Sequence, residues 1–131
     1  MTTAITCAAI LAVLLFLLGF NVSRMRGVTA KTGGSQLPAD PASPLLIAIR
    51  AHGNAAEYIP TLIVLLLVCS TLSDSWLVDA LAVAALVVRT THAVGMLSAK
   101  TLAAHGPLRD VGAFGTYFTG IALGVTAIVT I

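Results

Sequence analysis

The chain alternates four long apolar segments with short polar ones. Each apolar segment is long enough, at 1.5 Å per helical residue, to cross the ~30 Å hydrocarbon core of a bilayer. Residues 24–43 lie between the first two segments, combine charges with glycine and proline, and are predicted to form a long loop. The pattern predicts transmembrane helices over about residues 3–22, 44–72, 75–99 and 109–131.

Composition agrees with a membrane protein. Of 131 residues, 58% are hydrophobic and 9% are charged, whereas soluble domains carry roughly a quarter charged residues. The predicted fold class is therefore an all-α integral membrane protein, a four-transmembrane-helix bundle with one domain over residues 1–131. A net charge of +2 is too small for a nucleic-acid-binding surface. Cys7 and Cys69 have no metal-ligand spacing, so no metal site is expected.

The basic residues are distributed unevenly along the predicted helices. All seven fall in the first and third loops or in the helix segments nearest those loops, while both termini and Asp74 lie toward the opposite face. The positive-inside rule then places loops one and three in the cytoplasm and both termini on the other side. The basic residues are Arg24, Arg26, Lys31, Arg50, Arg89, Lys100 and Arg109.

The second predicted helix carries a polar stripe. At ~100° per residue, Arg50, Asn54 and Glu57 fall within a narrow arc with Tyr58 beside it. A cation, an amide, a carboxylate and a phenol on one stripe could recognise a zwitterion. The structural alternative is an internal Arg–Glu pair that neutralises both charges. His52 points to a different side and is expected to be structural.

A second polar cluster lies on the third predicted helix. Arg89, His92 and Met96 are spaced i, i+3 and i+7 and so share one face, and Arg109 begins the fourth helix on the same side of the membrane. Ionisable groups inside a membrane are costly and usually functional. Several arginines converging on one membrane face suggest an anionic ligand.

These segments carry a resemblance to a known family. Residues 50–60, Arg-Ala-His-Gly-Asn-Ala-Ala-Glu-Tyr-Ile-Pro, resemble the R-A-x-x-N-x-x-E-Y-x-P motif of the MAPEG family, the membrane-associated proteins in eicosanoid and glutathione metabolism. Residues 89–95 resemble an R-x-x-H-x-x-G pattern of its bacterial and microsomal-transferase branches. The Arg24/Arg26 segment and Arg109 support the match.

The resemblance implies a homotrimer that binds glutathione between neighbouring subunits near the cytoplasmic side. Arg50 and Asn54 would hold the carboxylates and backbone of glutathione, Glu57 its γ-glutamyl amine, and Tyr58 a further polar group. On the third helix Arg89 would contact the ligand, and His92 and Met96 occupy positions that are tyrosines in the leukotriene-forming synthase, which weakens an eicosanoid reading. The catalytic arginine of that synthase would fall near Ala103, which cannot stabilise a thiolate.

Arg109 matches an arginine of the microsomal glutathione transferases and is therefore expected to stabilise the glutathione thiolate. Arg24 and Arg26 are the alternatives, and the structural explanation for Arg109 is an anchor for the start of the fourth helix. The thiol chemistry needs such a cation, because a free thiol with a pKa of ~8.5 is mostly protonated at neutral pH.

The expected function is a glutathione-dependent enzyme, a transferase or a peroxidase, acting on hydrophobic electrophiles or lipid hydroperoxides that arrive through the membrane lipid. The alternative is a non-enzymatic lipid-binding protein that uses the same intersubunit cleft. A transporter or channel is disfavoured, because the charged groups gather at one end and leave no ionisable path across the other half. Short loops and the Arg-Ala-His-Gly-Asn form of residues 50–54 resemble bacterial members, so a bacterial inner membrane is expected, with the endoplasmic reticulum as the alternative.

Overall fold

The computed structural model describes all 131 residues and contains four helices and no strand. Each helix is long and apolar enough to cross a membrane, which confirms the predicted all-α integral membrane bundle. The helices are α1 (Thr2–Lys31), α2 (Pro44–Leu72), α3 (Trp76–Leu97) and α4 (Pro107–Thr130).

The bounds of α2 are those predicted, but α1 is longer than expected. It continues through Lys31, so the segment 24–31, predicted as loop, is helical. Charges do not end a helix, and this segment contains no proline; α1 stops where Gly33 adopts a φ of +70°. At the other boundaries α3 ends at Leu97, and α4 starts two residues early, because Pro107 suits the first helical turn.

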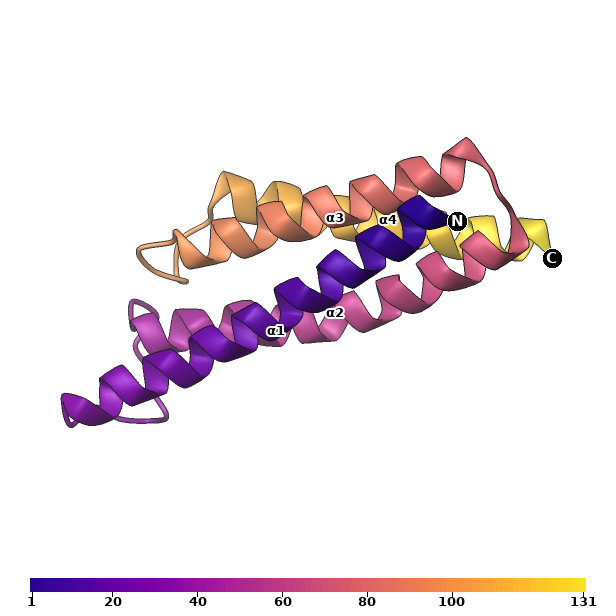
Figure 1. Cartoon of the computed structure of the whole chain (residues 1–131). Coiled ribbons are helices and arrows are strands. Elements are labelled where there is room, and N and C mark those ends of the chain that lie inside the picture. Colours follow the sequence, from indigo (N-terminus) through magenta and orange to yellow (C-terminus); the bar gives the residue numbers. More distant parts are fainter.

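The helices form a four-cornered bundle in which α2 and α3 occupy the short diagonal. α1 packs against α2 and α4 against α3, while α2 and α3 also touch each other and both outer helices. α1 and α4 make no contact; in Figure 1 α1 lies in front of α2, and α4 is partly hidden behind α3. A polar site that uses both central helices can therefore open toward either α1 or α4.

The core is narrow and rich in small side chains. Six of its sixteen residues are alanines, which let the helices approach closely, and the larger members include Leu11, Ile59, Leu66 and Leu123. Large apolar side chains such as Phe16 (79% exposed), Phe114 and Phe118 point outward. Small side chains inside and large apolar side chains outside suit a bundle that is surrounded by lipid or by another copy of the chain.

Glycines bring α3 and α4 into backbone contact. A Cβ on Gly112 would lie 2.6 Å from the His92 backbone nitrogen, and a Cβ on Gly95 would lie 2.5 Å from the Arg109 nitrogen. Gly115 lies equally close to the side chain of Val88, whose Cγ1 would be 2.5 Å from an added Cβ. Further along α4 the packing loosens, because nothing lies within 4 Å of a Cβ on Gly124.

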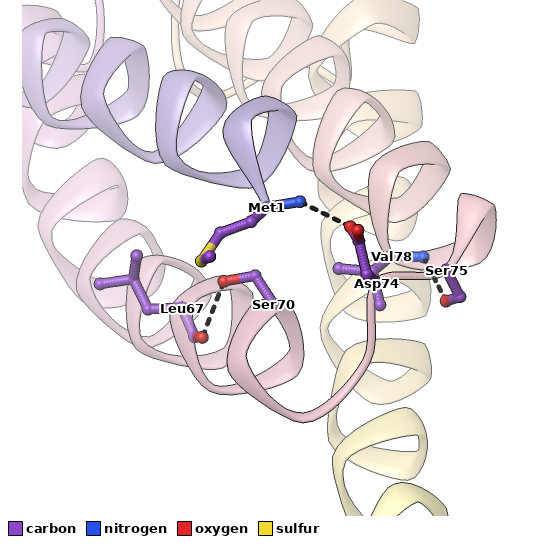
Figure 2. A network of polar contacts seen from close by, with 6 residues as sticks. All are labelled: Met1, Leu67, Ser70, Asp74, Ser75 and Val78. Atoms are coloured by element: carbon purple, nitrogen blue, oxygen red, sulfur yellow. Dashed lines mark hydrogen bonds and ion pairs between the residues drawn. The ribbon is translucent and has the colours of Figure 1, made fainter.

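The two ends of the bundle differ in their connections. The terminal end holds both chain termini and the Ser73–Ser75 turn, and the loop end holds loops 32–43 and 98–106, with α1 extending beyond the start of α2 (Figure 1). At the terminal end the Met1 amine donates to Asp74 Oδ1 at 2.9 Å, and Ser75 Oγ accepts from the Val78 N–H at the start of α3 (Figure 2). The hydrogen bond to Asp74 raises the pKa of the Met1 amine. Every lysine and arginine lies in the loop-end half of its helix or in a loop.

Candidate functional site

A polar cavity of about 300 Å³ opens at the loop end between α2, α3 and α4. It gathers residues that the sequence places far apart. Four of its lining residues belong to the predicted site, and the other five come from α3, α4 and loop 98–106. The lining is Arg50 and Asn54 on α2, His92 and Met96 on α3, Leu102 in the loop, and Arg109, Asp110, Ala113 and Tyr117 on α4.

Behind this cavity lies a buried guanidinium. Arg89 is 1% exposed, its Nη2 donates to Asn54 Oδ1 at 2.9 Å, and its Nη1 donates to Thr116 Oγ1 at 3.3 Å. Its Cζ lies 5.5 Å from the centroid of the Tyr58 ring. No carboxylate pairs with it, and its Nε has no partner. The positive charge of Arg89 is thus stabilised by two neutral hydrogen-bond acceptors and by the face of an aromatic ring.

This contact fixes the direction of the Asn54 amide. A guanidinium only donates, so Asn54 must turn its oxygen toward Arg89, and its NH₂ group is left for the cavity. Arg89 itself does not line the cavity. The structure therefore places Arg89 behind Asn54, rather than beside the space that a ligand would fill.

Tyr58 and Tyr117 form a pair beside the cavity, and only Tyr117 lines it. Their hydroxyls are 3.4 Å apart and their ring centroids 5.6 Å apart. Both also line a groove of about 350 Å³ between α2 and α4, whose other walls include Leu62, Leu65 and Ile121. Tyr117 thus stands where a polar cavity meets an apolar groove.

Arg109 lies in the first turn of α4, three residues after the N-cap Gly106. Its Nη2 donates to the Ala104 carbonyl at 2.7 Å, which leaves other N–H groups of the guanidinium free. The backbone N–H groups of the same turn add to the positive potential. Asp110 beside it lines the cavity, and its Oδ2 lies 3.5 Å from His105 Nδ1.

The remaining predicted site residues lie outside the cavity. Glu57 is exposed on α2. The chain has two ion pairs, Met1–Asp74 and His105–Asp110, and Glu57 belongs to neither. The internal Arg–Glu pair considered from the sequence therefore does not form. Arg24 is held by Asn21 Oδ1 and lines a different cavity. Arg26 is exposed at the end of α1. His52 packs against Gly19 on α1, away from the site.

Sequence reasoning missed Asp110, Thr116 and Tyr117. The carboxylate beside Arg109 was visible in the sequence as an ionisable residue at a helix start, but nothing there showed which face of α4 turns inward. That face is set by the contact of Gly112 with His92. Three arginines and one carboxylate give the site a positive balance, which suits an anionic ligand.

The comparisons with known proteins agree with the motifs. The family model of the MAPEG family matches residues 4–129, nearly the whole chain. No curated protein matches it.

Proposed function

Because the chain belongs to the MAPEG family, we propose that it is a glutathione-dependent enzyme that transfers the glutathione thiolate to hydrophobic electrophiles or reduces lipid hydroperoxides. The family includes glutathione transferases and peroxidases as well as other members. The observation that carries the proposal is the loop-end cavity, where Arg50, Asn54, His92 and Arg109 converge.

The lining suits the groups of glutathione. Arg50 is exposed and free of protein partners, so its planar guanidinium can bind a carboxylate through two parallel hydrogen bonds. Asn54 offers the amide NH₂ that Arg89 leaves free. His92 adds a ring whose Nδ1 has no partner in the chain.

Glu57 supports an assembly of several copies. It is exposed near the middle of a membrane-spanning helix, where an unpaired carboxylate facing lipid is costly. In a homotrimer a neighbouring subunit would cover this face, and Glu57 would meet the γ-glutamyl ammonium of glutathione bound between subunits. Tyr58, one residue further, would add a polar contact.

Arg109 is proposed as the thiolate stabiliser. Glutathione supplies a nucleophilic thiolate that adds to an electrophilic carbon. With a hydroperoxide, the thiolate attacks the terminal oxygen, the O–O bond breaks to release the alcohol, and a second glutathione converts the resulting sulfenic acid to glutathione disulfide and water. A cation beside the sulfur lowers the thiol pKa from ~8.5 and so raises the reactive fraction at neutral pH. Arg24 and Arg26 are the alternative cations, which a neighbouring subunit would have to contribute.

The second substrate is proposed to enter along the groove between α2 and α4. Its lining is almost wholly apolar and leads to Tyr117, which also borders the polar cavity. A hydrophobic electrophile or a lipid hydroperoxide dissolved in the bilayer could reach the thiolate by this path without crossing water.

Titration of glutathione into the purified protein, followed by thiolate absorbance, tests the proposal. Wild type should form the thiolate, Arg109→Ala should not, and Lys31→Ala should behave as wild type, because Lys31 lies at the same end but lines no cavity. Loss of the thiolate in Arg24→Ala or Arg26→Ala instead would transfer the role to that residue. A wild-type protein that neither binds glutathione nor forms its thiolate would refute the proposal.

A second candidate function is non-enzymatic lipid binding, favoured by the apolar groove itself. Lipid retained by the purified assembly, without any thiol chemistry, would support it over the enzyme.

For location we propose a bacterial inner membrane with loops 32–43 and 98–106 in the cytoplasm. Both native cysteines are buried, so a single introduced cysteine reports on sidedness. An impermeant maleimide added to intact cells should label Asp74→Cys but not His105→Cys. The opposite result would invert the orientation.

A further inference from the structure

A second and larger cavity lies at the loop end, on the other side of the central α2–α3 pair. Its volume is about 570 Å³, and it opens between the end of α1, the start of α2 and the end of α3. It shares no lining residue with the polar cavity between α2, α3 and α4 that contains Arg50, so its ligand need not be glutathione.

The charged residues that line this second cavity are all positive. Arg24 and Lys100 line it, and none of its ten lining residues is acidic. Arg24 is oriented by Asn21, whose Oδ1 accepts from its Nε at 3.3 Å and its Nη2 at 2.9 Å. Lys100 takes part in neither salt bridge of the chain. The nearby carboxylate of Asp40 turns back on its own loop, where Oδ1 accepts from the Ala42 N–H at 2.9 Å.

The rest of the wall is apolar. Ile47 and Ala48 are buried one turn inward from Pro44, and Met25 and Leu97 complete the sides. The cations come from the loop-end parts of the chain, and the apolar residues of α2 continue inward along the helix. This arrangement suits a molecule with an anionic head and a hydrocarbon body. It does not suit a peptide zwitterion, because no carboxylate is present to meet an ammonium.

We propose that this cavity binds one anionic phospholipid, with the headgroup phosphate between Arg24 and Lys100 and the start of the acyl chains against Ile47 and Leu97. Arginine and lysine both bind phosphate, and the cavity lies at the end where the bundle meets the polar surface of the membrane. The site shares no lining residue with the cavity proposed to bind glutathione. It shares Arg24 with the proposed function only if Arg24, rather than Arg109, stabilises the thiolate.

The test compares two double variants with the same loss of charge. Arg24→Gln/Lys100→Gln removes both cavity cations, and Arg26→Gln/Lys31→Gln removes two loop-end cations that do not line the cavity. Each protein is placed in nanodiscs of phosphatidylcholine with a small fraction of phosphatidylglycerol, and bound lipid is counted by native mass spectrometry. All four positions are exposed, so both variants should fold.

Wild type and the control variant should retain one phosphatidylglycerol per chain, and the cavity variant should bind it roughly tenfold or more weakly. Equal binding by the two double variants would overturn the proposal, because attraction would then come from the basic surface as a whole. In a second arm, glycerol 3-phosphate is added to pure phosphatidylcholine nanodiscs. If it binds with the same dependence on Arg24 and Lys100 and the same affinity, the ligand is a soluble phosphate ester and the assignment to a lipid is wrong.

Discussion

The loop end and the terminal end of the bundle satisfy their polar groups in different ways. At the terminal end several polar groups find partners within the chain: Cys69 Sγ contacts the Leu123 carbonyl, Ser70 Oγ donates to the Leu67 carbonyl, and Met1 pairs with Asp74. At the loop end Arg50 and Lys100 have no partner in the chain, and two cavities open beside them. Unpaired charge and open space coincide only there.

The difference separates the part of the bundle that holds the fold from the part that holds ligands. The terminal half of the interior is filled by residues such as Leu66, Val78 and Leu123, each no more than 2% exposed. Cations that the chain leaves unpaired at the loop end can pair with an anionic ligand through charge-assisted hydrogen bonds. Substitutions of the unpaired loop-end cations should therefore change binding and catalysis, whereas substitutions of the paired polar groups at the terminal end should change stability alone.

The largest effect is expected from Arg109→Ala. Loss of a cation beside the reacting sulfur should lower the rate of glutathione conjugation about a hundredfold, by analogy with the removal of one electrostatic donor from an active site. The conjugation rate with a chromogenic electrophile measures it across pH, and the fall should be smaller at high pH, where the thiolate forms unaided. Arg109→Lys, which keeps the charge, should recover part of the rate. An unchanged rate in Arg109→Ala would leave Arg109 as a helix anchor only.

The next effect concerns the close packing of α3 and α4. Gly112→Ala places a methyl group 2.6 Å from the backbone of His92, and such overpacking should cost about 1–3 kcal/mol in the free energy of unfolding. Gly124→Ala near the terminal end is the matched control, because its methyl group meets nothing within 4 Å and alanine favours the helix. Thermal unfolding of the purified proteins compares them. Equal destabilisation by both would show that α4 packs as tightly at the terminal end.

A smaller effect is expected from Glu57→Gln. Loss of the carboxylate should weaken glutathione binding about tenfold if Glu57 meets the ammonium, within the range for a hydrogen bond to a charged group. Asp79→Asn is the control, since Asp79 is a carboxylate in the first turn of α3 at the terminal end. Isothermal titration of glutathione measures both. Unchanged affinity in Glu57→Gln would remove the ammonium contact from the proposal.

Much of the fold could be predicted from the sequence, because membrane spans need only length and hydropathy. The start of α2 at Pro44 follows from proline chemistry. The predicted end of α1 is wrong, because polar residues alone do not end a helix, and α1 continues to Lys31, just before Gly33 adopts a left-handed conformation.

The site was only partly predictable. Helical spacing put Arg50 and Glu57 on one stripe, but they are seven residues apart, roughly 10 Å along the axis, and only Arg50 reaches the cavity. The position of Arg89 behind Asn54 depends on how closely α4 approaches α3, which brings Thr116 within reach. Such distances between helices follow from tertiary packing and not from periodicity within one helix.

The smallest effect tests whether the helix caps at the two ends of the bundle contribute equally to stability, so that the ends differ only in the residues that bind ligands. Ser43 caps α2 at the loop end and Ser75 caps α3 at the terminal end, and each hydroxyl accepts a backbone N–H at 3.4 Å. Replacing either serine by alanine should cost about 1 kcal/mol in the free energy of unfolding, since both caps satisfy one backbone donor. Denaturant unfolding monitored by circular dichroism compares Ser43→Ala with Ser75→Ala. A much larger cost for Ser43→Ala would mean that the start of α2 also depends on the ligands held beside it, and that fold and site are not separable at the loop end.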